Sequence, residues 1–127
     1  EVSVDRGSGN ISLHKLVCAV DCGTAVYPDA IVAQMEGAAV MASSVALYEK
    51  INFGEGGVQT RNYDEYQLAT MSDIPEIEVH IVDSKHPIGG VGEPGVPAVA
   101  PAIANAIFQA TGVRLRELPF DSELLKA

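Results

Sequence analysis

A glycine-dense loop that runs directly into an apolar helix constrains the fold of this chain more than any other feature. The segment from Ile88 to Phe108 reads IGGVGEPGVPAVAPAIANAIF. Its first part, Gly89–Gly95, is dense in glycine, which lets a ligand come close to the main chain. Its second part opens an alanine-rich stretch, Val96–Thr111, that favours a helix. The sequence therefore predicts a loop at a helix N-terminus, where free N–H groups favour an anion such as phosphate.

The predicted helix carries one apolar stripe and recognisable ends. Pro97 and Pro101 are expected in its first turn, where a missing N–H is not needed. Gly112 follows Thr111 as a left-handed cap. The side chains expected to face the core recur at helical spacing: Val99, Ile103, Ile107 and Ala110.

Glu93 is the only ionisable side chain between Pro87 and Gln109, and Gly92 and Pro94 flank it. A solvated loop glutamate is the ordinary case for this residue type. A lone carboxylate in apolar surroundings is also a candidate general base. The residues alone leave both interpretations open.

Upstream, the pattern predicts a β-hairpin and one long helix. The hairpin joins the weak alternation of Glu1–Asp5 to a strand over Ile11–Asp21, through a turn at Arg6–Asn10. The helix runs from Asp29 to about Lys50 and is rich in small residues, so that neighbouring backbones approach closely. Its predicted core side chains are Ile31, Met35, Ala38, Ala42 and Val45.

The remaining segments complete an α+β domain. A turn is expected at Asn52–Gly57 and an irregular stretch at Val58–Met71. A half-buried strand is expected within Ile74–Asp83. After the second helix, we expect a last strand or extended piece at Val113–Pro119 and a partly disordered tail to Ala127. We predict a single domain over residues 1–127: a small, mainly antiparallel sheet packed with one long central helix and a C-terminal helix preceded by the glycine-rich loop.

Composition excludes several partners and sites. The net charge of −9 argues against nucleic acid or an anionic membrane surface as a partner. No apolar run is expected to span a membrane, and no signal peptide is visible. Cys18 and Cys22 would lie too far apart along a strand for a disulfide, and a single such pair is a poor zinc site. We therefore predict two buried thiols and no metal ligands in this chain.

Three blocks follow one another along nearly the whole chain: CAVDCGTAVYPDAIVAQMEGAAVMASSVALYEKI from Cys18 to Ile51, NYDEYQLATMSDIPEIEVHIVDS from Asn62 to Ser84, and GGVGEPGVPAVAPAIANAIFQATGVRLRELP from Gly89. Together they resemble the large subunit of the molybdenum hydroxylases, the xanthine oxidase and aldehyde oxidoreductase family. The bacterial isoquinoline 1-oxidoreductase beta-subunit branch is the most similar. Such subunits are several times longer, so this chain, which begins at Glu1, is expected to be a C-terminal fragment.

The resemblance implies a site and a reaction. Glu93 would be the active-site base, Gln34 would lie against the molybdopterin cofactor, and Gly90, Val91 and Gly92 would belong to the cofactor-binding loop. From the residues alone, the favoured interpretation of Gln34 is a half-buried helix glutamine bonded to nearby backbone. The implied reaction is hydroxylation of an aldehyde or N-heterocycle with oxygen derived from water.

The implied partners lie outside this chain. They are the remainder of the large subunit and an iron–sulfur subunit, because two cysteines cannot supply the four thiolates of a cluster. The sequence does not distinguish between the bacterial cytoplasm and the periplasm as the compartment. We expect the isolated fragment to fold, to be inactive and to self-associate through its uncovered apolar surface.

Two rival functions are weighed against this one. Gly90, Gly92 and Gly95 spell the G-x-G-x-x-G pattern of a dinucleotide-binding module. Pro94 and Pro97 remove N–H donors that a pyrophosphate would use, and that pattern should open immediately after a strand. The other rival is a non-catalytic assembly domain.

Overall fold

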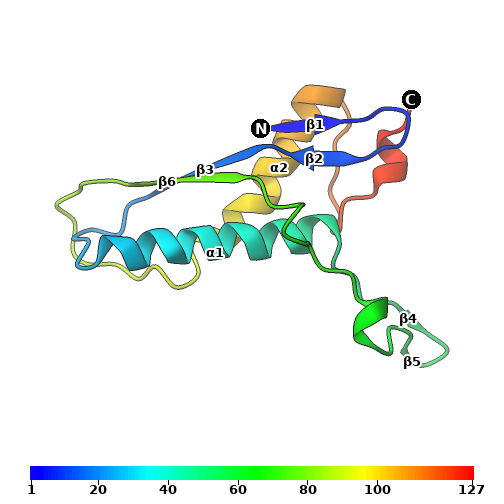
Figure 1. Cartoon of the computed structure of the whole chain (residues 1–127), viewed down its shortest axis with the longest axis horizontal. Coiled ribbons are helices and arrows are strands. Elements are labelled where there is room, and N and C mark those ends of the chain that lie inside the picture. Colours follow the sequence, from blue (N-terminus) through cyan, green and yellow to red (C-terminus); the bar gives the residue numbers. More distant parts are fainter.

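The computed structural model describes residues 1–127 and combines two long helices with three two-stranded sheets (Figure 1). The helices are α1 (Pro28–Leu47) and α2 (Gly95–Thr111), with short 3-10 turns η1 (Tyr63–Glu65) and η2 (Ser122–Leu125). The strands are β1 (Val2–Val4), β2 (Ile11–Leu13), β3 (Lys15–Val20), β4 (Phe53–Gly54), β5 (Gly57–Val58) and β6 (Glu76–Ile81). The α+β class, the long central helix and the loop-started C-terminal helix are confirmed.

The sheets differ from the expected mainly antiparallel arrangement in one respect. The β1–β2 and β4–β5 pairs are antiparallel, but the longest pair, β3–β6, is parallel, with Lys15 opposite Glu76. A parallel pair needs a long crossover, and the chain from β3 to β6 supplies it through α1. The crossover brings the C-terminal ends of β3 and β6 to the same end of the strand pair. There the Gly89 N–H, in the loop that precedes α2, donates to the Cys22 carbonyl.

The predicted strand over Ile11–Asp21 is divided at His14 because the chain changes partner there. The His14 N–H donates to the Glu1 carbonyl at 2.9 Å, and the Glu1 ammonium group donates to the Lys15 carbonyl at 2.6 Å, where the pairing with the N-terminal segment ends. The His14 carbonyl accepts from the Glu76 N–H at 3.0 Å, which begins the pairing with β6. One extended segment therefore serves two sheets, and the hairpin prediction holds only for its first part.

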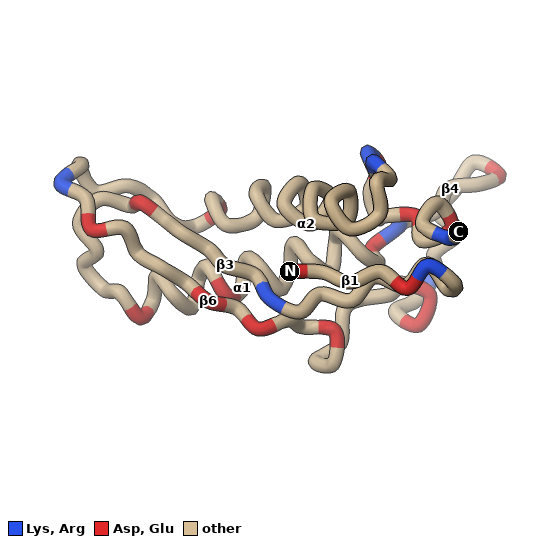
Figure 2. The backbone as a smooth tube through the Cα atoms, turned by 90° about the horizontal axis from the view of Figure 1, so that it is seen from above, with Lys and Arg blue, Asp and Glu red and all other residues tan.

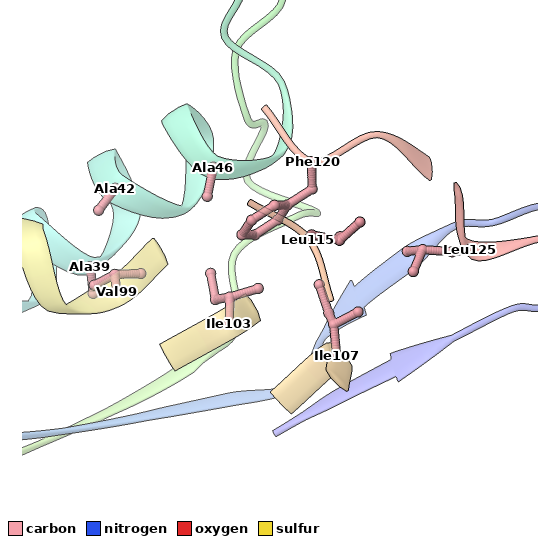
Figure 3. Close-up of a cluster of buried hydrophobic side chains, with 9 residues drawn as sticks. All are labelled: Ala39, Ala42, Ala46, Val99, Ile103, Ile107, Leu115, Phe120 and Leu125. Carbon is pink, nitrogen blue, oxygen red and sulfur yellow. The ribbon is translucent and has the colours of Figure 1, made fainter. Parts of the chain in front are cut away.

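The main core lies where α1, α2 and the C-terminal segment meet (Figure 3). Ile103 and Ile107 of α2 are 1% and 0% exposed and point into this cluster. Nine buried side chains form it: Ala39, Ala42, Ala46, Val99, Ile103, Ile107, Leu115, Phe120 and Leu125. The small α1 residues let α2 pack closely, as the composition of the helix predicts.

Several details of the two helices differ from expectation. Val45 is 37% exposed and Ala110 is exposed, so neither extends the buried stripe of its helix. Pro101 lies inside α2 rather than in its first turn. α1 ends at Leu47, so Lys50 lies beyond it. Gly112 is a left-handed cap with φ 74°, and its N–H donates to Phe108, as predicted.

The C-terminal segment is ordered, so the predicted disorder was wrong. Val113–Pro119 forms no strand; instead, the Phe120 N–H donates to the Ala46 carbonyl at 2.8 Å. Leu125 is fully buried in the core, and the Ala127 N–H donates to the Arg6 carbonyl at 3.0 Å. The tail is therefore held by packing at one end of the β1–β2 hairpin.

The segment with β4, β5 and η1 projects away from the body of the molecule (Figure 1). α1 is long and apolar enough to cross a membrane, by length and composition only, which the sequence analysis did not anticipate. Eight of its residues are buried against the rest of the chain, as in the core helix of a folded domain.

Candidate functional site

The glycine-rich loop lies beside α1, and one side chain joins them. The Gln34 Nε2 donates to the Gly92 carbonyl at 2.5 Å. Gln34 and Gly92 are exposed, and the bond connects residues far apart in the sequence. Gln34 therefore holds the loop with one amide N–H, while its amide oxygen and its second N–H have no partner in the chain.

Gly95 places the end of this loop directly on α1. A Cβ atom at Gly95 would lie 2.7 Å from the Ala38 Cβ and 3.2 Å from the Met35 sulfur. Real Cβ atoms do not approach a neighbour so closely. Glycine is therefore required here for contact between the two helices, and its role is packing rather than ligand approach.

A hollow of about 730 Å³ opens between α1 and the loop. Its walls are Gln34, Gly37, Ala38, Met41, Gly92, Glu93, Pro94, Val96 and Pro97. The structure thus brings three of the predicted site residues, Gln34, Gly92 and Glu93, to one hollow. A second hollow of about 380 Å³ is lined by Gln34 and Gly92 together with Val91 and Cys22. The Gln34–Gly92 bond lies where the two hollows meet.

The loop offers main-chain donors. The N–H groups of Gly90, Val91, Gly92 and Glu93 have no acceptor within the chain. Cβ atoms added at Gly90 and Gly92 would meet nothing within 4 Å, so space beside the backbone is open. Unpaired N–H groups and an amide side chain fit a ligand rich in oxygen and negative charge.

Glu93 is exposed and makes no ion pair. Its carbonyl accepts from the Val96 N–H at 3.1 Å, which fixes the backbone at the start of α2. α2 carries no charged residue along its length (Figure 2), so Glu93 is the one carboxylate on this side of the hollow. The Glu93 side chain lines the hollow, and no group of the chain pairs with its carboxylate.

A polar cluster that the sequence did not predict lies at the ends of the parallel strands. Asp21 follows β3, and its Oδ1 accepts from the Ser84 hydroxyl at 2.5 Å and from the Gly23 N–H at 3.0 Å. His86 Nδ1 lies 3.4 Å from the Asp21 Oδ2. The Ser84 and Gly23 donors, with His86 nearby, lower the pKa of Asp21 below its ordinary value. The Asp-Cys-Gly sequence could have predicted the bond between Asp21 and Gly23, because an Asp side chain commonly accepts from the N–H two residues later in a turn.

No cluster of His, Cys, Asp or Glu in the chain is suited to hold a metal ion. Cys18 is half-buried, and burial raises the pKa of its thiol. Cys22 is buried, and both cysteines are free. β6 ends at Ile81, well before Gly90, so the glycine pattern does not open directly after a strand as a dinucleotide site requires.

Comparison with known proteins gives the site a context. The family model of the molybdopterin cofactor-binding domain matches residues 1–75. The chain is 39% identical over 119 residues to isoquinoline 1-oxidoreductase subunit beta of Brevundimonas diminuta, which covers 94% of the chain. It is 43% identical over 119 residues to a protein of Gluconacetobacter polyoxogenes named as a membrane-bound, pyrroloquinoline-quinone aldehyde dehydrogenase. The chain spans only 15% of the length of each of these two relatives.

Solved structures agree in fold. The chain superposes on a Cu,Mo-dependent CO dehydrogenase with a TM-score of 0.85, at 26% identity, over 98% of this chain and 17% of that one. It superposes on quinoline 2-oxidoreductase from Pseudomonas putida with a TM-score of 0.88, at 22% identity, over 98% of this chain and 17% of that one. At that identity the second likeness concerns the fold alone.

Proposed function

Since the chain belongs to the family of molybdopterin cofactor-binding domains, we propose that residues 1–127 form a single domain, the C-terminal part of a molybdenum hydroxylase large subunit. The proposed reaction is oxidative hydroxylation of an aldehyde or an N-heterocycle. The observation that carries it is the Gln34–Gly92 bond, which brings Gln34, Gly92 and Glu93 to one hollow.

We assign the cofactor to the face of the glycine-rich loop. The free N–H groups of Gly90, Val91 and Gly92 would donate to its oxygen atoms. Gln34 would add its free amide oxygen and N–H. Its bond to Gly92 would hold the side-chain amide in a fixed position relative to the loop. The support is the absence of any competing partner for these groups within the chain.

Glu93 is the proposed base. When bound, the molybdenum cofactor supplies the redox chemistry, and the protein positions it and moves protons. A Glu93 Oε atom would accept the proton released as the substrate is attacked. A carboxylate that lines the hollow and pairs with no group of the chain suits this role.

The partners of this proposal lie outside the chain. Electrons would leave through iron–sulfur clusters on another subunit, because Cys18 and Cys22 cannot supply four thiolates. The relatives are named for isoquinoline, nicotinate and aldehyde oxidation, which sets the proposed substrate class. The remainder of the large subunit would close the two hollows into a substrate cavity.

Elemental and cofactor analysis of the full-length protein tests the proposal. We expect molybdenum and a pterin near one equivalent each per large subunit. A pyrroloquinoline quinone in place of the pterin, the cofactor named for one relative, would overturn the molybdenum assignment. A protein purified with neither would favour a non-catalytic assembly domain.

A further inference from the structure

We propose that Asp21, Gly23, Ser84 and His86 form a clamp that positions the cofactor loop. The clamp touches no part of the two hollows except through its neighbours, so its members are positioning residues. The effect on turnover rests on the proposed function, whereas the effect on the loop itself does not.

The clamp joins two strand ends. Because β3 and β6 are parallel, Asp21 and Ser84 leave the pair at the same edge. The Val82 N–H donates to the Val20 carbonyl at 2.8 Å and extends the ladder to this edge. The Ser84 hydroxyl then donates to the Asp21 Oδ1 at 2.5 Å, so the side chains continue the pairing where the backbone stops.

The turn after β3 is shaped to receive the segment before the loop. Gly23 has φ +69°, and a Cβ there would lie 2.3 Å from the Pro87 carbonyl oxygen. The Gly23 N–H donates to the Asp21 Oδ1 at 3.0 Å, which holds this turn. The Gly89 N–H donates to the Cys22 carbonyl at 2.9 Å. The clamp therefore fixes the chain immediately before Gly90.

The loop is consequently held at three points. Its start is held by Cys22 and the clamp, its middle by Gln34 at Gly92, and its end by Gly95 against Ala38. The N–H groups between these points are free. A carboxylate at Asp21 thus sets where the free donors and Glu93 lie, without touching a ligand.

Hydrogen exchange on the full-length protein tests the clamp. In Asp21→Ala, we expect the Gly89 amide, which donates to the Cys22 carbonyl, to exchange about tenfold faster, with the α1 and α2 core amides unchanged. Ser84→Ala should change the exchange of the Gly89 amide in the same direction. Asp83→Ala is the matched control, because Asp83 is exposed, lies next to Ser84 and makes no hydrogen bond or ion pair.

Steady-state kinetics add a second readout in the loaded enzyme. We expect Asp21→Ala to lower kcat about tenfold or more with little change in KM, because a misplaced base weakens the chemical step. Asp21→Asn should restore much of kcat, since its amide oxygen still accepts from Ser84 and Gly23. A carboxylate with a merely structural role would not lower kcat while leaving KM unchanged, and Asp21→Asn would not restore kcat.

The two proposals fail in different ways. Molybdenum and pterin content of the wild-type protein decides the proposed function, and loop exchange decides the clamp with or without a cofactor. Exchange of the Gly89 amide that stays at the wild-type rate in Asp21→Ala and Ser84→Ala, or that rises equally in Asp83→Ala, would overturn the clamp. If Asp21→Ala does not fold, Ser84→Ala alone decides.

Discussion

A single methyl group at Gly95 should separate the two helices that frame the hollow. In Gly95→Ala the new Cβ would lie 2.7 Å from the Ala38 Cβ, whereas ordinary contact begins at 3.4 Å. The helices must therefore move apart by about 0.7 Å at this point. Ala38 is 5% exposed and Met35 is 2% exposed, so neither has free space into which to withdraw.

The cost follows from the packing. Overpacking a buried contact costs about 1–3 kcal/mol, and the higher helix propensity of alanine returns up to about 1 kcal/mol. We expect Gly95→Ala to lower the free energy of unfolding by about 1–2 kcal/mol. Ala38→Gly removes the clashing methyl group, although glycine within α1 costs about 1 kcal/mol by itself.

A double-mutant cycle isolates the contact. Urea denaturation followed by circular dichroism would give the free energy of unfolding of the wild type, the two single variants and the double variant. We expect Gly95→Ala to cost at least about 0.5 kcal/mol less in the Ala38→Gly background than in the wild type. Additive effects would refute the claim that this contact requires glycine.

Other predictions follow from single contacts. Gln34→Ala in the full-length protein should lower cofactor content, because a hydrogen bond to a charged group contributes about 1.5–3 kcal/mol; full occupancy and turnover would make Gln34 structural. The Lys15 and His80 bonds lower the pKa of Glu78, and the Ser84 and Gly23 bonds lower that of Asp21. Their stabilisation is present above the ordinary pKa values of 4.5 and 3.8 and is lost as pH falls through the lower folded values, so urea midpoints should decrease there. The isolated chain should associate, because Phe53 and Met71 are 77% and 90% exposed; a monomer by light scattering at high concentration would argue against this.

Local patterns were sufficient to predict much of the fold. Both helices could be placed from apolar spacing, because Ile31, Met35, Ile103 and Ile107 each fill the core that their spacing indicates. The left-handed cap at Gly112 follows from one residue type. These features depend on short-range geometry, which the sequence expresses directly.

Features that depend on distant partners could not be read in the same way. Nothing local to His14 indicates that β2 and β3 pair with different strands. The order of the C-terminal tail depends on Leu125 reaching a core built by both helices. Pro101 is accommodated inside α2, although its residue type predicts a first-turn position.

In the candidate site, too, local features could be predicted from the sequence and contacts between distant residues could not. Glu93 stood out as a lone carboxylate, and Gln34 was selected only through a family resemblance. The Gln34–Gly92 bond, which relates the two, required the fold. The Asp21–Ser84 contact was missed because it joins residues from strands that become neighbours only through a long crossover.

Glu93→Gln in the full-length, cofactor-loaded protein tests the central claim most directly. The substitution keeps the shape of the side chain and removes its ability to accept a proton, so stability and molybdenum content should not change. We predict a loss of turnover of about 10²–10⁴-fold, the usual contribution of a general base. Turnover near the wild-type rate in a variant with full molybdenum content would contradict the account and remove Glu93 from the mechanism.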